Sequence, residues 1–266
     1  MNDLSYLVTR IKDISIEAGK GILDIYNSGY SVEHKDDSSP LTDADMVSHN
    51  IICKYLSDFM PDIPVLSEES SDISYEKRQT WQRYWLIDPL DGTREFIKRN
   101  GEFTVNIALV ENHNPVLGVV HVPVSGVTYY AHSGSGTYKQ LNDHEPCKIT
   151  TRKTSPLQLT VAGSRSHGSA RQQAFIEKLG DVEVFAIGSS LKFCMVAEGR
   201  VDIYPRFGPT SEWDTAAAQC IVEEAGGIVV DEHFKRLQYN CGNSLLNPNF
   251  LVIGDPAFDW EPYLPE

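Results

Sequence analysis

The sequence has few cysteines, and none of them follow a spacing that suggests a structural or metal-binding role. There are five, an odd number, and no two are separated as CxxC. This argues against a disulfide framework and against a thiolate zinc site, so we expect a reducing compartment. The histidines form no HExxH pair, so the helix of a zinc protease is not predicted either.

Long apolar runs and an excess of positive charge are also missing. No apolar stretch approaches the roughly 20 residues that span a bilayer. Residues 1–10 lack the basic and then apolar order of a signal peptide, so we expect a cytoplasmic protein without a transmembrane segment. The net charge is −14, which repels nucleic-acid backbones and excludes a DNA or RNA polymer as the expected partner. A small anionic substrate would need cations or a basic pocket at its site.

The composition is that of a folded protein, with 41% hydrophobic residues in a chain of 266. Apolar residues at steps of three and four predict an amphipathic helix over Leu4 to Asn27. A polar stretch follows, and a second helix is expected to begin at Thr42 or Asp43 and to end before Pro61. The next segments alternate between turn signals and β-formers. They predict strands over Pro64–Glu68, Trp85–Ile87, Thr104–Val110, Leu117–Val124 and Val127–Ala131, with Asn114-Pro115 as a turn.

The second half of the chain alternates between strand and helix signals, which is typical of a layered α/β unit. We place a domain boundary between Lys148 and Pro156. It divides the chain into an α+β subdomain over residues 1–150 and an α/β subdomain over residues 151–266.

One short motif predicts chemistry. Residues 88–93 read DPLDGT, at the end of a predicted strand and before a predicted helix. Pro89 restricts the backbone and Gly92 permits a sharp turn, so the carboxylates of Asp88 and Asp91 can be held toward one point. Oxygen ligands of this kind suit Mg²⁺, and the start of the following helix suits a phosphate.

Other acidic segments could complete such a site: SEES at 67–70, WDTAA at 213–217 and PLTDAD at 40–45. An Asp at a helix start is usually only an N-cap, so each segment taken alone is weak. Their occurrence together strengthens the prediction of a metal site.

The four motifs together resemble the inositol-monophosphatase superfamily. DPLDGT matches its first signature, WDTAAAQCIVEEAGG at 213–227 matches its second, and PLTDAD and SEES stand at the expected upstream positions. The resemblance implies a layered αβαβα sandwich and a Mg²⁺-dependent phosphomonoesterase. It also implies inhibition by lithium.

A narrower resemblance, to the bisphosphate-nucleotidase branch, rests on residues 81–110, SRSH at 164–167, GSSLKFCMVAEG at 188–199 and YPRFGPTSEWD at 204–214. It implies hydrolysis of the 3'-phosphate of adenosine 3',5'-bisphosphate to give AMP, with 3'-phosphoadenylyl sulfate as a second substrate, in support of sulfate assimilation. Relatives of this kind are also described at the cytoplasmic face of the inner membrane.

The superfamily resemblance implies a role for each matching residue. The ligands of two or three Mg²⁺ ions would be Glu68, Asp88, Asp91, Asp214 and the backbone carbonyl of Leu90. The catalytic residues that orient the attacking water would be Asp45 and Thr93, together with Glu68. The scissile phosphate would lie among the metal ligands and the segment Leu90, Asp91, Gly92 and Thr93.

The branch resemblance also implies substrate contacts in the second half. Ser189, Lys192 and Arg206 would bind the 5'-phosphate, and His167 would lie near the nucleotide. From spacing alone, plainer interpretations remain open: Lys192 could be a solvated helix residue, Arg206 could pair with Asp202 or Glu212, and Ser189 could be an N-cap.

Two other functions stay open at this point. An inositol- or sugar-phosphate phosphatase would share the chemistry, and a catalytically silent metal or nucleotide sensor would share the ligands. The oligomeric state could be monomer or homodimer. The segment HSGSGT at 132–137 lacks the P-loop ending, and we interpret it as a hairpin turn.

Overall fold

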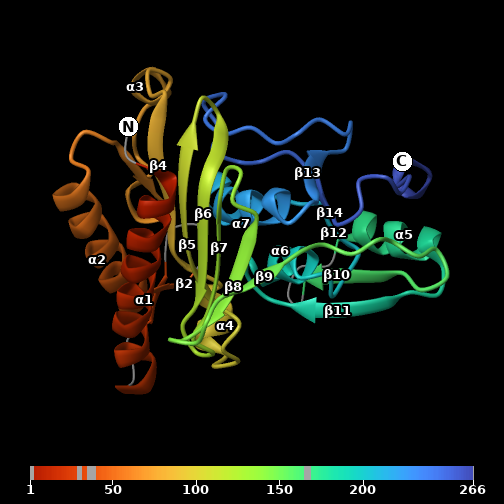
Figure 1. The fold of residues 1–266 in the computed structure, drawn as a ribbon, viewed down its shortest axis with the longest axis horizontal. Coiled ribbons are helices and arrows are strands. Elements are labelled where there is room, and N and C mark those ends of the chain that lie inside the picture. Colours follow the sequence, from red (N-terminus) through yellow and green to blue (C-terminus); the bar gives the residue numbers. More distant parts are fainter. Residues whose placement is uncertain (1–2, 29–31, 35–39, 165–168, 266) are drawn as a thin grey trace.

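The computed structural model describes residues 3–28, 32–34, 40–164 and 169–265. Its helices and sheets alternate in five layers, in the order helix, sheet, helix, sheet, helix (Figure 1). The predicted αβαβα sandwich is therefore confirmed. The described helices include none that is both long and apolar enough to cross a membrane.

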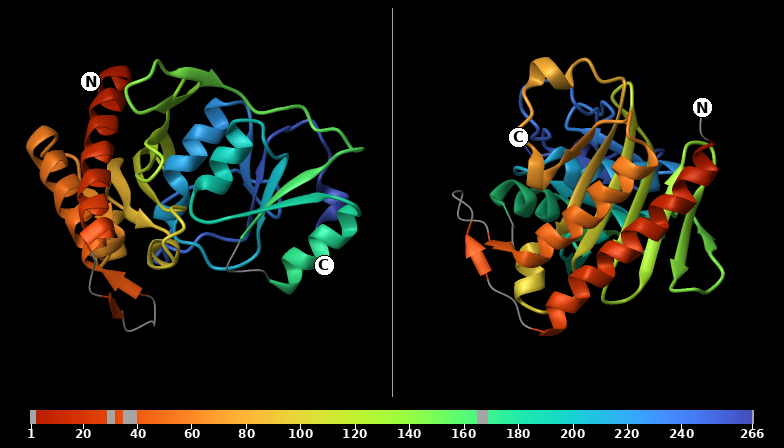
Figure 2. Two further views of the ribbon diagram at one scale, coloured as in Figure 1. Left: turned by 90° about the horizontal axis from the view of Figure 1, so that it is seen from below. Right: turned by 90° about the vertical axis from the view of Figure 1, so that its left-hand side faces the viewer.

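The first layer consists of α1 (Leu4–Ser28) and α2 (Asp43–Phe59), which run side by side across one face of the larger sheet (Figure 2, right). Both predicted helices are confirmed, the first from its periodicity and the second from its expected start at Thr42 or Asp43 and its end before Pro61. On α1 the predicted apolar positions Leu7, Ile11 and Ile22 are completely buried. A short hairpin of β1 (Val32–His34) and β2 (Pro40–Thr42) connects the two helices.

The second layer is a seven-stranded sheet in the order β3-β4-β5-β6-β7-β8-β9. The strands are β3 (Val65–Ser67), β4 (Arg83–Asp91), β5 (Thr104–Glu111), β6 (Asn114–Val122), β7 (Val127–His132), β8 (Thr137–Leu141) and β9 (Cys147–Ile149). Three short helical turns flank the sheet: η1 (Glu68–Ser70), α3 (Tyr75–Arg78) and α4 (Thr93–Ile97).

The predicted turn at Asn114-Pro115 is wrong. Asn112 and His113 have positive φ angles of 46° and 67° and form the turn, and β6 begins directly after them at Asn114. Pro115 lies within the strand, opposite Val110, at a register shift where a missing backbone N–H is tolerated. Asn is one of the residues that adopts a positive φ most readily, so the turn forms one pair earlier.

The third layer consists of α6 (Leu191–Ala197) and α7 (Glu212–Glu224), which lie between the two sheets (Figure 1). Helix α7 packs against β4, β5, β6 and β7 of the larger sheet and against β13 (Ile228–Asp231) of the smaller one. Its backbone approaches β6 so closely that a Cβ at Gly118 would lie 2.1 Å from the carbonyl oxygen of Ala217. The glycine is required here for space.

The smaller sheet has the order β11-β10-β12-β14-β13, with α5 (Ala170–Leu179) on its outer face. Its strands are β10 (Thr160–Ser164), β11 (Glu183–Ile187), β12 (Ile203–Arg206), β13 (Ile228–Asp231) and β14 (Phe250–Ile253), and the turn η2 (Glu261–Tyr263) follows. Sequence reasoning missed β14, which pairs antiparallel with both β12 and β13. The five cysteines are free.

The division into two subdomains stays a prediction. The largest core cluster combines residues from both halves, such as Val120 of β6 and Ile221 of α7. The connecting segment is tied to the smaller sheet by Arg152, whose guanidinium donates two hydrogen bonds to the buried carboxylate of Asp202.

Candidate active site

A β-bulge places two carboxylates on the same side of β4. Asp88 is paired with Asn106 and Asp91 with Thr104, so the two residues between the aspartates oppose a single residue of β5. Side chains alternate along a regular strand, so positions three apart would point to opposite faces. The extra residue cancels this alternation, and both aspartates face the same space.

Residues of the bulge itself suit this geometry. Pro89 has no N–H to lose from the ladder, and its carbonyl oxygen accepts a hydrogen bond from the Ser48 hydroxyl of α2 at 2.7 Å. The backbone N–H of Leu90 donates to the Asp88 carboxylate at 3.1 Å. The Leu90 side chain is buried in the core beneath α1 and α2, which leaves only its backbone for the site.

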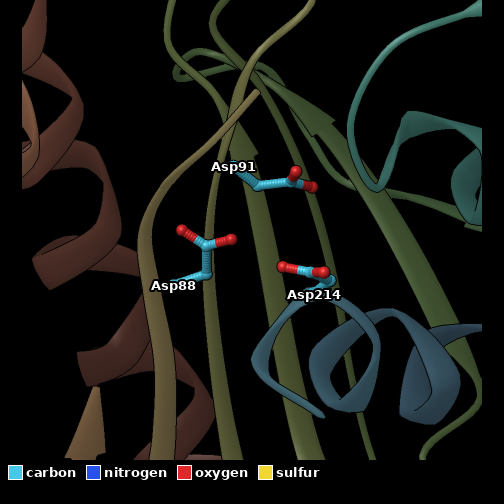
Figure 3. A group of neighbouring side chains, drawn as sticks. All are labelled: Asp88, Asp91 and Asp214. Atoms are coloured by element: carbon cyan, nitrogen blue, oxygen red, sulfur yellow. The ribbon is translucent and has the colours of Figure 1, made fainter. Parts of the chain in front are cut away.

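The third carboxylate comes from the first turn of α7. Asp214 accepts a hydrogen bond from the backbone N–H of Ser211 at 2.9 Å, which fixes its side chain at the helix start. The carboxylates of Asp88, Asp91 and Asp214 converge, with one oxygen of each within 4.8 Å of the others (Figure 3). Segments more than 120 residues apart are thus brought together, as the sequence motifs predicted.

The electrostatics of this cluster favour a bound cation. Burial, followed by the negative charges of Glu68, Asp91 and Asp214, raises the pKa of Asp88 well above its usual value. Burial, followed by the charges of Asp91 and Glu68, raises the pKa of Asp214 to about 8. Without a counter-charge the cluster holds protons near neutral pH. A divalent cation would replace those protons, and oxygen-only donors are the ligand set of Mg²⁺ and similar hard cations.

Asp91 is held by hydrogen bonds that the sequence did not predict. Its Oδ2 accepts from the Ser190 backbone N–H at 2.6 Å, from the Ser190 hydroxyl at 2.8 Å and from the Asn106 amide at 3.3 Å. The Thr104 hydroxyl lies 3.4 Å from the same oxygen. Asn106 and Thr104 alternate on one face of β5 opposite the aspartates, which is the one signal in the sequence that could have revealed them.

Two further predicted acidic residues lie beside this cluster. Glu68 opens η1 directly after β3, and its charge is close enough to affect the pKa values of both Asp88 and Asp214. Asp45 lies on α2 and is 2% exposed. Its carboxylate accepts a hydrogen bond from the Thr93 hydroxyl at 3.4 Å, so the pair predicted to orient water is brought together.

Gly92 turns the chain from β4 into α4 with a φ of 97°, a conformation that favours glycine. The segment Leu90 to Thr93 thus passes from the bulge to the start of a helix, as the motif predicted. Asp43, one of the two residues expected to begin the second helix, is its exposed first residue.

The residues predicted to contact a second phosphate lie on α6, on the turn before it, and on β12. Lys192 is buried, and its ammonium donates to the carbonyl oxygen of Ser189 at 2.7 Å. Its interpretation as a solvated helix residue is therefore wrong. Burial lowers the pKa of Lys192 to about 8, while the charge of Asp91 opposes that shift and the charge of Arg206 adds to it.

Arg206 pairs with neither of the two carboxylates considered from the sequence. Its guanidinium donates to the Thr210 hydroxyl and to the Pro209 carbonyl, each at 2.8 Å. Asp202 and Glu212 are bound instead by Arg152 and by the backbone N–H of Asn240.

The remaining predicted positions have different outcomes. The N-cap of α6 is Ser190, and Ser189 accepts a 3.4 Å hydrogen bond from Leu191 through its hydroxyl. His167 lies outside the described residues. The segment 132–137 forms a turn between β7 and β8, as predicted, and two of its backbone N–H groups donate to the Glu224 carboxylate at 2.9 and 3.0 Å.

Comparison with known proteins decides the family. A model of the inositol monophosphatase family matches residues 3–253. The chain belongs to this family. Inositol monophosphatase family members are metal-dependent phosphatases, and the acidic cluster is the place where this chain can hold a metal.

Close relatives and solved structures extend this result. The chain is 47% identical to the 3'(2'),5'-bisphosphate nucleotidase CysQ of Salmonella typhimurium, over 92% of this chain and 99% of that protein. It is 41% identical to CysQ of Haemophilus influenzae, over 96% and 95% of the two chains. The crystal structure of CysQ from Bacteroides thetaiotaomicron is similar with a TM-score of 0.79 and 42% identity, over 91% of this chain and 94% of that one.

Proposed function

We propose that the protein is a 3'(2'),5'-bisphosphate nucleotidase that removes the 3'-phosphate of adenosine 3',5'-bisphosphate, giving AMP and phosphate. One observation carries the proposal: the converging carboxylates belong to a chain that matches CysQ nucleotidases over nearly their whole length. 3'-Phosphoadenylyl sulfate is the second substrate we propose, and the activity would support sulfate assimilation in the cytoplasm. The substrate of this site would be a small nucleotide and not a nucleic-acid polymer.

The metal in this proposal is Mg²⁺, bound as two or three ions. Asp88, Asp91 and Asp214 would hold it with Glu68 and the carbonyl oxygen of Leu90. The ions, when bound, supply positive charge that offsets these carboxylates and polarises the phosphoryl group and the attacking water. This reverses the sign of the local field in a chain whose net charge is −14, so that an anionic substrate can enter.

The remaining steps fall to side chains of the chain itself. The Thr93 hydroxyl donates a hydrogen bond to Asp45. The lone pairs of the Thr93 oxygen are then free to accept a hydrogen bond from water. Asp45 would take up the proton that this water loses, through the Thr93 hydroxyl. The backbone from Leu90 to Thr93 would hold the scissile phosphate, and attack in line would release it without a covalent intermediate.

Recognition of the second phosphate would separate this enzyme from phosphatases of simpler monoesters. Lys192 and Arg206 supply two positive charges, and the charge of Arg206 is close enough to lower the pKa of Lys192. Arg offers a planar fork and Lys a point charge, and Ser189 adds a hydroxyl. Binding of a 5'-phosphate would draw the Lys192 ammonium from the Ser189 carbonyl, and His167 would complete the nucleotide contact.

Phosphate release from adenosine 3',5'-bisphosphate and from inositol 1-phosphate, each with and without Mg²⁺, tests the proposal. We expect Mg²⁺-dependent turnover with the nucleotide preferred in kcat/KM. A large preference for the inositol ester would identify an inositol or sugar phosphatase instead. Absence of Mg²⁺-dependent turnover on any phosphomonoester would favour a metal or nucleotide sensor.

A further inference from the structure

The Ser190 hydroxyl joins two of the segments that carry the acidic cluster. It lies 2.8 Å from the Asp91 carboxylate and 2.8 Å from the backbone carbonyl oxygen of Asp214. Asn106 donates to it from β5 at 2.9 Å. The residue is 2% exposed, so these contacts are made away from bulk water.

The position of the single hydroxyl proton follows from this geometry. Because the Asn106 amide donates to Ser190, one lone pair of the hydroxyl oxygen is occupied. The proton then points to the Asp91 carboxylate or to the Asp214 carbonyl, which are the two acceptors within reach. Donated to the Asp214 carbonyl, the proton ties the turn before α6 to the first turn of α7, while the Ser190 backbone N–H holds Asp91; donated to Asp91, it adds a second hydrogen bond to that carboxylate.

Ser190 is not used as an ordinary helix cap. It occupies the N-cap position of α6, yet its side chain accepts no hydrogen bond from that helix. An N-cap serine normally accepts one from the second or third helical N–H, and this contact stabilises the helix. Here the hydroxyl points to the acidic cluster instead. Helix α6 therefore lacks the stabilising N-cap hydrogen bond, and a role of Ser190 at the cluster explains why.

The turn before α6 is built to present Ser190 in this way. The N–H of Gly188 donates to the Glu102 carboxylate at 2.9 Å, and a Cβ at Gly188 would lie 2.6 Å from the side chain of Glu95. Ser189 has a φ of 49°, in the left-handed region that non-glycine residues rarely occupy. Such a conformation persists only where surrounding contacts hold it, and it directs the Ser190 N–H to Asp91.

We propose that Ser190 is a positioning residue that fixes Asp91 relative to α7, and thereby sets the distance between the Asp91 and Asp214 carboxylates for a shared divalent cation. The inference rests on the proposed function, because it assumes Mg²⁺ in the cluster. It adds a residue whose contribution passes through the metal ligands and not through contact with the substrate.

Substitution of Ser190 by alanine tests this, because it removes the hydroxyl and leaves the backbone N–H bond to Asp91. Ser15→Ala is the matched control: Ser15 is buried like Ser190, and its hydroxyl donates to the Lys12 carbonyl in α1, away from the site. The first readout is the dissociation constant of Mg²⁺ for the nucleotide-free protein, measured by calorimetry. The second is the Mg²⁺ concentration that gives half-maximal turnover, together with KM for adenosine 3',5'-bisphosphate.

We expect Ser190→Ala to raise the Mg²⁺ dissociation constant about tenfold, as loss of a hydrogen bond to a charged group does. The half-maximal Mg²⁺ concentration should rise in parallel, while KM for the nucleotide at saturating Mg²⁺ stays within about twofold. Ser15→Ala should leave all three values unchanged. A merely structural role for Ser190 would lower the melting temperature without weakening Mg²⁺ binding by the folded protein.

Wild-type affinity for Mg²⁺ in Ser190→Ala overturns the inference. If that variant does not fold, Ser190→Cys, which keeps the size of the side chain but donates weakly, should weaken Mg²⁺ binding about threefold, and an unchanged constant overturns the inference equally. The proposed function fails separately. A wild-type protein that binds no Mg²⁺ refutes both proposals, whereas one that binds Mg²⁺ but prefers inositol 1-phosphate refutes only the proposed substrate.

Discussion

Replacement of Asp214 by asparagine should stabilise the metal-free protein. The folded protein holds a proton on Asp214 up to a pKa of about 8, whereas in the unfolded chain this carboxyl titrates near 3.8. Between these values the folded state binds more protons than the unfolded state, so stability falls as pH rises and is lowest above about pH 8. Asparagine carries no charge, and its carbonyl oxygen can still accept the hydrogen bond from Ser211.

The size of the effect follows from the same interval. About four pH units at about 1.4 kcal/mol each set an upper limit of about 6 kcal/mol at pH 8. Asp214 is partly exposed, so water and counterions screen much of this, and we expect Asp214→Asn to gain about 2 kcal/mol. In a chain of this length that corresponds to a rise of about 5 °C in the melting temperature.

Thermal unfolding in EDTA at pH 5, 6, 7 and 8 measures this difference. The gain should be smallest at pH 5 and largest at pH 8. Asp231→Asn is the control, because Asp231 also accepts backbone N–H bonds but lies outside the cluster. With millimolar Mg²⁺ the order should reverse, since the ion stabilises only the intact site. The reasoning is refuted if Asp214→Asn is less stable than wild type at pH 8 in EDTA, or if wild-type stability rises from pH 5 to 8.

Three other substitutions test separate parts of the structure. Asp91→Asn should lower Mg²⁺-dependent phosphate release at least about 100-fold with the fold retained, because a metal ligand is lost, and near-normal turnover would contradict the site. Lys192→Gln should raise KM for adenosine 3',5'-bisphosphate about tenfold but leave KM for adenosine 3'-monophosphate unchanged, and equal effects on both substrates would argue against a 5'-phosphate contact. In the wild type, KM for the bisphosphate should rise above pH 8, where Lys192 loses its proton. Gly118→Ala should cost about 3 kcal/mol in urea unfolding, because its Cβ would collide with Ala217, and a wild-type midpoint would show that α7 can shift.

The sequence predicted those parts of the fold that local pattern controls. The periodicity of α1 and the caps and stops of α2 were sufficient, because one face of each helix is buried and the other is not. The order of β14 in the smaller sheet was not predictable in this way, because it depends on pairing with β12 and β13 from other parts of the chain. The turn before β6 lies one residue pair earlier than predicted. Asn and Pro are both turn formers, and their spacing in the sequence does not tell which of these residues make the turn.

The sequence predicted the carboxylates that could bind a metal, but not the residues that hold those carboxylates in place. Asp88, Asp91 and Asp214 belong to motifs with a chemical signature, and the structure brings them together. Ser190 and Asn106 carry no such signature. Their contacts depend on a β-bulge and on a left-handed residue at the turn before α6, which single-sequence patterns do not specify.

The position of α7 between the sheets has a consequence for dividing the protein. A fragment ending near residue 150 would keep Asp88 and Asp91 but would present the inner face of its sheet, including Val120, to water. The complementary fragment would keep Asp214 and lack the surface on which α7 rests. Neither piece contains a whole metal site, so a gene cut at this linker would yield a complementation pair in which phosphatase activity reports reassembly.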